Sequence, residues 1–167
     1  ACWGYAADYL FSRGVGSDTP VSINYGALAG KAVRQIEFTP YNACARTADS
    51  VVACWGNNFK GLLGNGTNTV ASYPAVAEYN SVAPVRVSMP SLGGATITDL
   101  SAASSSACAL LSTNRIYCWG EMWPWRQGAT RTPVELSTNG LRGITNIEVI
   151  RSGICAVADG VPYCWGF

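Results

Sequence analysis

The sequence predicts an all-β protein built from repeated units of about four short strands each. Three observations support this. Cys-Trp-Gly occurs four times, Pro-Val precedes three of those copies, and no segment shows the sustained i, i+3, i+4, i+7 apolar spacing of a helix. Units of roughly 46 to 64 residues with about four strands each are typical of propeller blades rather than of a β-sandwich.

The markers divide the chain into repeats. The Cys-Trp-Gly copies begin at Cys2, Cys54, Cys118 and Cys164, and the marker prolines are Pro20, Pro84 and Pro133. We therefore predict a single domain, 1–167, with repeats at about 5–56, 57–120 and 121–167. Residues 1–4 would be the tail of a preceding repeat, so about three blades of a partial ring are present.

Each unit is expected to begin with a strand at its marker proline, because a sheet tolerates proline at the first residue of a strand. The second strand is predicted at the paired aliphatic residues Val33 and Ile36, Ile97 and Leu100, and Ile144 and Ile147. The third begins near the first cysteine of the unit. The fourth ends at Trp-Gly, where residues 51–55 and 116–119 are rich in β-branched and aromatic side chains.

Cysteine spacing predicts three disulfides, each joining the last two strands of a unit. The pairs are ten, ten and nine residues apart: Cys44 and Cys54, Cys108 and Cys118, Cys155 and Cys164. The third pair is centred on Asp159-Gly160, a favoured hairpin turn, and residues equidistant from such a turn lie within disulfide range. Reduced core thiols and a metal site are the alternatives, but nine- and ten-residue spacings without histidine fit zinc poorly. Cys2 remains as a free or intermolecular thiol.

Composition limits the compartment and the partners. Eleven basic and ten acidic residues give a net charge of +1, which excludes binding to nucleic acid by bulk phosphate attraction and binding to a membrane surface through basic residues. No apolar run is long enough to insert into a membrane. The chain opens on Ala1 without a targeting segment, so we expect a signal peptide to have been removed. Disulfides indicate a secreted, extracellular or cell-surface location, or the periplasm.

The run 51–67, Val-Val-Ala-Cys-Trp-Gly-Asn-Asn-Phe-Lys-Gly-Leu-Leu-Gly-Asn-Gly-Thr, resembles the signature of the RCC1-like (regulator of chromosome condensation) repeat. Residues 84–87 and 107–110 fit its other elements, and the cysteine-bearing form is similar to secreted bacterial members. The resemblance implies a seven-bladed β-propeller. It weakens after Gly4 and Gly120. The histidine that the family commonly has two residues before the first cysteine is replaced by Asn42, Ser106 and Gly153.

The resemblance implies binding rather than catalysis. The familiar family activity, nucleotide exchange on a small GTPase, depends on a complete ring and a specialised loop that nothing here matches. Other members are interaction platforms, including a secreted inhibitor of β-lactamases. With no histidine, a Ser-His-Asp triad is impossible within the chain. Asp99 and Glu148 are expected on exposed strand faces. We predict no enzyme activity, no metal and no cofactor.

Candidate binding residues lie in the segments between each Cys-Trp-Gly and the next marker proline, which vary in length while the rest of the unit barely changes. We expect these segments to be interblade loops on one face, shared with turns near Tyr41, Ser105 and Ser152. The predicted loop-face residues are Tyr5, Tyr9, Phe11, Tyr41, Phe59, Tyr73, Tyr79, Trp123, Trp125 and Arg126. Trp123 and Trp125 could instead form a small core under their loop. The recurring Trp3, Trp55, Trp119 and Trp165 are expected to pack between blades.

The sequence therefore favours a non-catalytic extracellular or cell-surface scaffold that binds another protein, or builds an assembly, through these loops. Partners are a protein or further blades or copies of the same chain, because apolar faces such as Val33, Ile36, Ile144 and Ile147 would demand a neighbour. Two alternatives remain: a lectin whose Trp or Tyr side chains stack on glycan rings, and a structural subunit of a filament or surface fibre.

Overall fold

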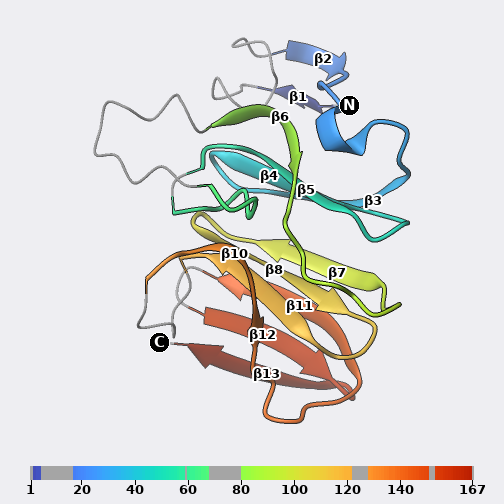
Figure 1. Ribbon diagram of the computed structural model, residues 1–167, viewed down its shortest axis with the longest axis vertical. Coiled ribbons are helices and arrows are strands. Elements are labelled where there is room, and N and C mark those ends of the chain that lie inside the picture. Colours follow the sequence, from blue (N-terminus) through green and yellow to red (C-terminus); the bar gives the residue numbers. More distant parts are fainter. Residues whose placement is uncertain are drawn as a thin grey trace.

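A computed structural model shows the chain as antiparallel sheets stacked along the long axis of the molecule (Figure 1). The structure describes residues 2–4, 17–58, 60–67, 80–121, 128–150 and 153–166. Within these ranges the only helix is a single 3-10 turn, η1, at Gly26–Leu28. None of the described helical structure is long and apolar enough to cross a membrane.

Two sheets have four strands each, and every strand pairs with its neighbour in the chain. The first sheet contains β3 (Val33–Phe38), β4 (Asn42–Thr47), β5 (Val52–Gly56) and β6 (Ser81–Arg86). The second contains β7 (Ile97–Ala102), β8 (Ser106–Leu111), β9 (Ile116–Gly120) and β10 (Thr130–Leu136).

Two smaller sheets flank this pair. The third sheet contains β11 (Ile144–Ile150), β12 (Gly153–Ala158) and β13 (Val161–Gly166). At the other end of the stack, β1 (Cys2–Gly4) pairs with β2 (Ser17–Val21). Cys2 lies opposite Val21, as Cys54 lies opposite Val85 and Cys118 opposite Val134, so the same pairing recurs in three copies of the repeat.

These pairings correct the predicted order of strands within a blade. The marker proline lies in the last strand of the preceding sheet, next to Cys-Trp-Gly, and the following sheet begins at the aliphatic strand. The sheets are therefore offset by one strand from the predicted units. The length variation of segments 57–80 and 121–129 had suggested boundaries between blades, but each segment connects two paired strands of the same sheet. The short connections 87–96 and 137–143 are the ones that pass to the next sheet.

The prolines also sit differently from the prediction. Pro20, Pro84 and Pro133 are each the fourth residue of their strand rather than the first. Each of these strands is at the edge of its sheet, where a missing backbone N–H removes no necessary ladder bond. Edge position is therefore what makes proline tolerable here.

Three disulfides join the predicted cysteine pairs, Cys44–Cys54, Cys108–Cys118 and Cys155–Cys164. In every pair the two cysteines lie directly opposite each other. Because of the offset, each bridge joins the second and third strands of its sheet rather than the last two of a blade. The first two bridges are buried in the apolar cores between sheets, whereas Cys164 of the third is exposed.

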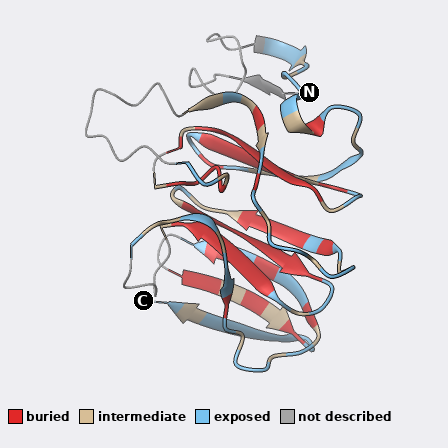
Figure 2. Ribbon diagram, in the orientation of Figure 1, coloured by how far each residue is buried: buried red, intermediate tan, exposed pale blue. Residues whose placement is uncertain are grey.

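Apolar side chains fill the spaces between successive sheets, and the two ends of the stack are more exposed (Figure 2). One core joins the first and second sheets around Leu100 and Trp119, and a second joins the second and third sheets around Ile147 and Ile154. The strand pairing shifts register near the start of β3 and of β7. The shift lets two residues three positions apart point to the same face of the sheet, Val33 with Ile36 in β3 and Ile97 with Leu100 in β7.

A polar seam crosses both interfaces at one register position of the first strands. Gln35 donates to Asp99 Oδ1 over 2.9 Å, and Asn146 donates to Asp99 Oδ2 over 3.1 Å. The backbone N–H groups of Leu100 and Ile147 also donate to this carboxylate. The expectation that Asp99 is exposed is therefore wrong, because this position faces the neighbouring sheets. Glu148 is exposed as predicted.

Candidate functional site

The described starts of the long segments and the turns after the first strands lie at one end of the sheets. Asn57 N–H donates to the Tyr41 carbonyl over 3.0 Å, and Glu121 N–H donates to the Ser105 carbonyl over 2.7 Å. The start of each loop is thus tied to the neighbouring turn. We call this region the variable-loop end: turns 39–41 and 103–105 with the described residues of the two loop segments, 57–58, 60–67, 80, 121 and 128–129. The corresponding Ser152 lies outside the described residues.

The description of these segments as interblade loops is wrong, because each connects the third and fourth strands of a single sheet. An antiparallel hairpin returns to the end from which it left, so the loop and the first turn still share one end of the sheet. The predicted common face is therefore correct for the described turns, although its connectivity is different.

Asn58 organises the first part of loop 57–80 from a fully buried position. Its N–H donates to Asn80 Oδ1, and its side-chain oxygen accepts the Leu63 N–H over 3.1 Å. Its side-chain N–H donates to Thr67 Oγ1 over 2.8 Å. A buried amide satisfied in this way fixes the loop backbone, so residues 57–58 and 60–67 form a rigid extension of the first sheet.

This extension reaches across to the second sheet. The Trp119 indole N–H donates to the Leu62 carbonyl over 2.8 Å, and Lys60 pairs with Glu121 over 3.0 Å. Trp55 and Trp119 have no exposed surface. Trp165 is partly exposed, and its buried indole nitrogen has no hydrogen-bond partner among the residues that the structure describes. The side chain of Trp3 lies outside the described residues.

Among the predicted binding residues, Tyr41 is the one that the structure describes. It sits in the β3–β4 turn with 58% of its surface exposed. The turn is fixed by Thr39, whose hydroxyl accepts the Asn42 N–H over 3.0 Å, and by the Asn42 side chain, which donates to the Asn57 carbonyl. Outside the described residues lie Tyr5, Tyr9, Phe11, Phe59, Tyr73, Tyr79, Trp123, Trp125 and Arg126.

Phe38 is an exposed aromatic residue that the sequence reasoning missed. It lies at the end of β3, three residues before Tyr41, and its ring contacts Trp55 edge to face at a centroid distance of 6.4 Å. The corresponding position of the second sheet is Ala102. The sequence could have indicated Phe38, because the next repeat has the small residue Ala102 at the position where the first repeat has an aromatic residue next to a turn.

Glu37 is the titratable group most affected by its surroundings at this end. Partial burial raises the pKa of its carboxyl, and the nearby carboxylates Glu148 and Asp99 raise it further. A hydrogen bond from Gln35, at 3.0 Å, acts in the opposite direction. The carboxylate form of Glu37 therefore opposes folding, since the folded chain favours the protonated form.

We expect Glu37→Gln to stabilise the protein at neutral pH, within about 1 kcal/mol because solvent screens a partly exposed group. A raised folded-state pKa contributes stability that is fully present below the unfolded pKa and is lost as pH rises through the folded pKa. The gain should therefore vanish below about pH 4. Urea unfolding across pH measures this, with Asp18→Asn as an exposed control. A variant that is less stable than the parent chain at pH 7 would contradict it.

In the described part of the chain, no group of three or more His, Cys, Asp or Glu side chains has an arrangement that could hold a metal ion. The geometry is instead that of stacked sheets whose first turns are fixed by hydrogen bonds at one end. Stacked four-stranded antiparallel meanders joined by short connections define the class of protein as a β-propeller.

Comparison with solved structures shows that the fold is similar to that of RCC1-like propellers. Human WBSCR16 superposes on 83% of the chain with a TM-score of 0.69 and 14% sequence identity. Prp20p from Saccharomyces cerevisiae superposes on 84% with a TM-score of 0.64 and 19% identity. The ectodomain of the receptor kinase CR4 from Physcomitrella patens superposes on 83% with a TM-score of 0.51 and 17% identity.

The superpositions cover 34%, 34% and 31% of those three proteins, so the chain spans about a third of their length. No protein-family model and no curated protein matches the sequence. At these identities the comparisons establish the fold, and the site must be argued from the chain itself.

Proposed function

We propose that the chain is a non-catalytic extracellular or cell-surface β-propeller scaffold that binds another protein through its variable-loop end. The observation that carries this is Tyr41, a largely exposed aromatic side chain on a turn fixed by buried hydrogen bonds, beside loops whose length varies between repeats. Loops on a rigid scaffold are the usual place for recognition, and tyrosine is enriched among residues that dominate binding energy.

The disulfides support the proposed location. All six cysteines that the repeat predicts to pair are bonded, and such bonds persist in oxidising compartments. The bonds cross-link the second and third strands of the three larger sheets, so the sheets that carry the turns remain ordered outside the cell.

The turn sequences favour a protein partner over a repeated glycan. A lectin that uses successive blades would place an aromatic ring at equivalent turns, but Tyr41 corresponds to Ser105 in the second unit and Ser152 in the third. A single aromatic residue at these three turns fits one contact with a protein partner better than repeated contacts with identical sugars.

Assembly with further sheets of the same repeat is a second candidate, supported by the exposed end of the stack. Val33 and Ile36 are 40% and 41% exposed, whereas the equivalent Ile97 and Leu100 of the second sheet are 3% and 1% exposed. The inner interfaces show what covers this face, namely the disulfide-bearing face of another sheet.

A photocrosslinking experiment tests both candidates. p-Benzoylphenylalanine is placed at Tyr41, at Ile36, or at Tyr25, an equally exposed tyrosine next to η1 away from the loops. Each protein is irradiated with intact cells and secreted proteins of the source organism. We expect a discrete heterologous adduct from position 41 and a homologous adduct from position 36. Equal adducts from positions 41 and 25, or binding to a glycan array that Tyr41→Ala abolishes, would overturn protein binding at this end.

A further inference from the structure

The end of the sheets opposite the variable loops carries two grooves at equivalent places in the repeat. The first, of about 490 Å³, lies between the β4–β5 turn and the connection that follows β6. The second, of about 440 Å³, lies between Arg115 and the connection that follows β10. Both volumes fall in the range of small-ligand sites. The strand register makes Arg86 of the first groove equivalent to Glu135 of the second.

The two grooves differ in charge. In the second, Arg115 donates to both oxygens of Glu135, over 2.8 and 2.6 Å, so its guanidinium is neutralised inside the groove. In the first, Arg86 is exposed, and no ion pair of its guanidinium is found among the described residues. Within the described ranges, the positive charge of the first groove is therefore uncompensated, whereas that of its counterpart is paired.

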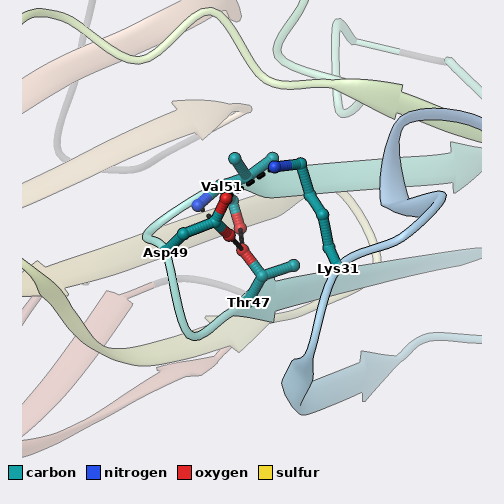
Figure 3. Close-up of polar contacts among 4 residues, drawn as sticks. All are labelled: Lys31, Thr47, Asp49 and Val51. Carbon is teal, nitrogen blue, oxygen red and sulfur yellow. Dashed lines mark hydrogen bonds and ion pairs between the residues drawn. The ribbon is translucent and has the colours of Figure 1, made fainter.

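The carboxylate nearest to the first groove in sequence is already engaged. Figure 3 shows Asp49 held by Lys31, at 2.5 Å, and by the Thr47 hydroxyl, within the turn that places Ser50 and Val51 on the groove wall. The hydrogen bond from Lys31 is the main cause that lowers the pKa of Asp49. Asp49 is thus fixed as the partner of Lys31 and leaves Arg86 available.

The walls of the first groove are ordered before any ligand arrives. Val87 N–H donates to the Val52 carbonyl and Ser88 N–H to the Gly64 carbonyl, both over 2.9 Å. Ser50 Oγ accepts the Ile97 N–H over 3.0 Å, which leaves its hydroxyl hydrogen for another acceptor. Buried Val52 and Val87 form an apolar floor, and exposed Ser88 and Ser91 form the rim.

We propose that this groove binds a carboxylate carried on a short aliphatic body. The guanidinium of Arg86 recognises the carboxylate, the serine hydroxyls donate further hydrogen bonds, and the valine floor takes the aliphatic part. A free organic acid and the carboxyl terminus of a peptide share this chemistry. The site is independent of the protein-binding function proposed for the opposite end.

The test is an NMR titration of the ¹⁵N-labelled full chain with 4-methylpentanoate, with a short peptide ending in a free leucine carboxylate, and with the amide of each. We expect the carboxylates to shift the amide signals of Ser50, Ser88 and Ser91. If 4-methylpentanoate has the lower dissociation constant, the ligand is a free organic acid; if the peptide has the lower one, the ligand is a peptide carboxyl terminus. Arg86→Gln should weaken binding about tenfold or more. Arg34→Gln, which removes an exposed arginine from β3, should leave the affinity unchanged.

The second groove is the internal control, because the same probes should leave the signals of Ser137 and Asn139 unchanged. The proposal is wrong if the amides bind as well as the acids, if Arg86→Gln retains the affinity, or if both grooves respond equally. It is also wrong if neither carboxylate shifts the groove signals at millimolar concentration.

Discussion

Replacement of Asp99 by alanine should destabilise the protein by about 2–4 kcal/mol, because buried backbone N–H groups lose the carboxylate that accepts their hydrogen bonds. The carboxylate accepts hydrogen bonds from the side chains of Gln35 and Asn146 and from the N–H groups of Leu100 and Ile147, at 2.8 to 3.1 Å. Alanine leaves all four donors without this acceptor at the two interfaces between sheets. Each unsatisfied buried donor costs about 1–3 kcal/mol.

Urea unfolding followed by tryptophan fluorescence measures the loss, because Trp119 is buried in the core between the first and second sheets. Asp99→Asn keeps the shape and one acceptor oxygen, so its loss should be intermediate. Asp49→Ala should cost much less than Asp99→Ala, because solvent screens its exposed ion pair with Lys31. If Asp99→Ala matches Asp49→Ala, the seam does not hold the sheets together.

The disulfide pairs and the strands were predictable because they depend on local spacing. Cysteines at equal distances from a tight turn face each other in any antiparallel hairpin, whatever the rest of the fold does. Cys155 and Cys164, centred on Asp159-Gly160, are the clearest case, and the structure pairs them as expected.

The position of the blade boundary was not predictable by the same reasoning. The pairing of β5 with β6 spans the segment 57–80, and spacing alone does not say whether a strand after a long segment returns to its own sheet or starts the next. The matching partners of Cys2, Cys54 and Cys118 show that it returns in every copy where both strands are described.

Asp99 and Arg86 show why site residues escaped the sequence. The partners of Asp99 come from residues 64 positions before and 47 positions after it, on strands that become neighbours only when the sheets stack. Arg86 looks like an ordinary exposed strand residue until its register equivalence with the paired Glu135 is known. Tyr41 could be proposed because turns that share one end follow from strand alternation alone.

Replacement of Gly120 by alanine should cost about 3 kcal/mol or more, because two effects combine at this residue. Gly120 has φ +87°, which disfavours any side chain, and a Cβ atom there would lie 2.9 Å from Ser106 Cα and closer still to the Ser105 carbonyl oxygen. Relief of that contact would break the Glu121-to-Ser105 hydrogen bond that fixes the variable-loop end.

Gly140→Ala is the matched control for this prediction. Gly140 has φ +83°, but nothing lies within 4 Å of a Cβ atom there. It should therefore lose only the cost of the left-handed conformation, about 1–2 kcal/mol. Chemical denaturation of both variants separates the two effects, since the excess loss in Gly120→Ala measures the contact with the turn. Equal losses would mean that the loop and the turn adapt to each other, and the variable-loop end would then be a pliable surface rather than a rigid one.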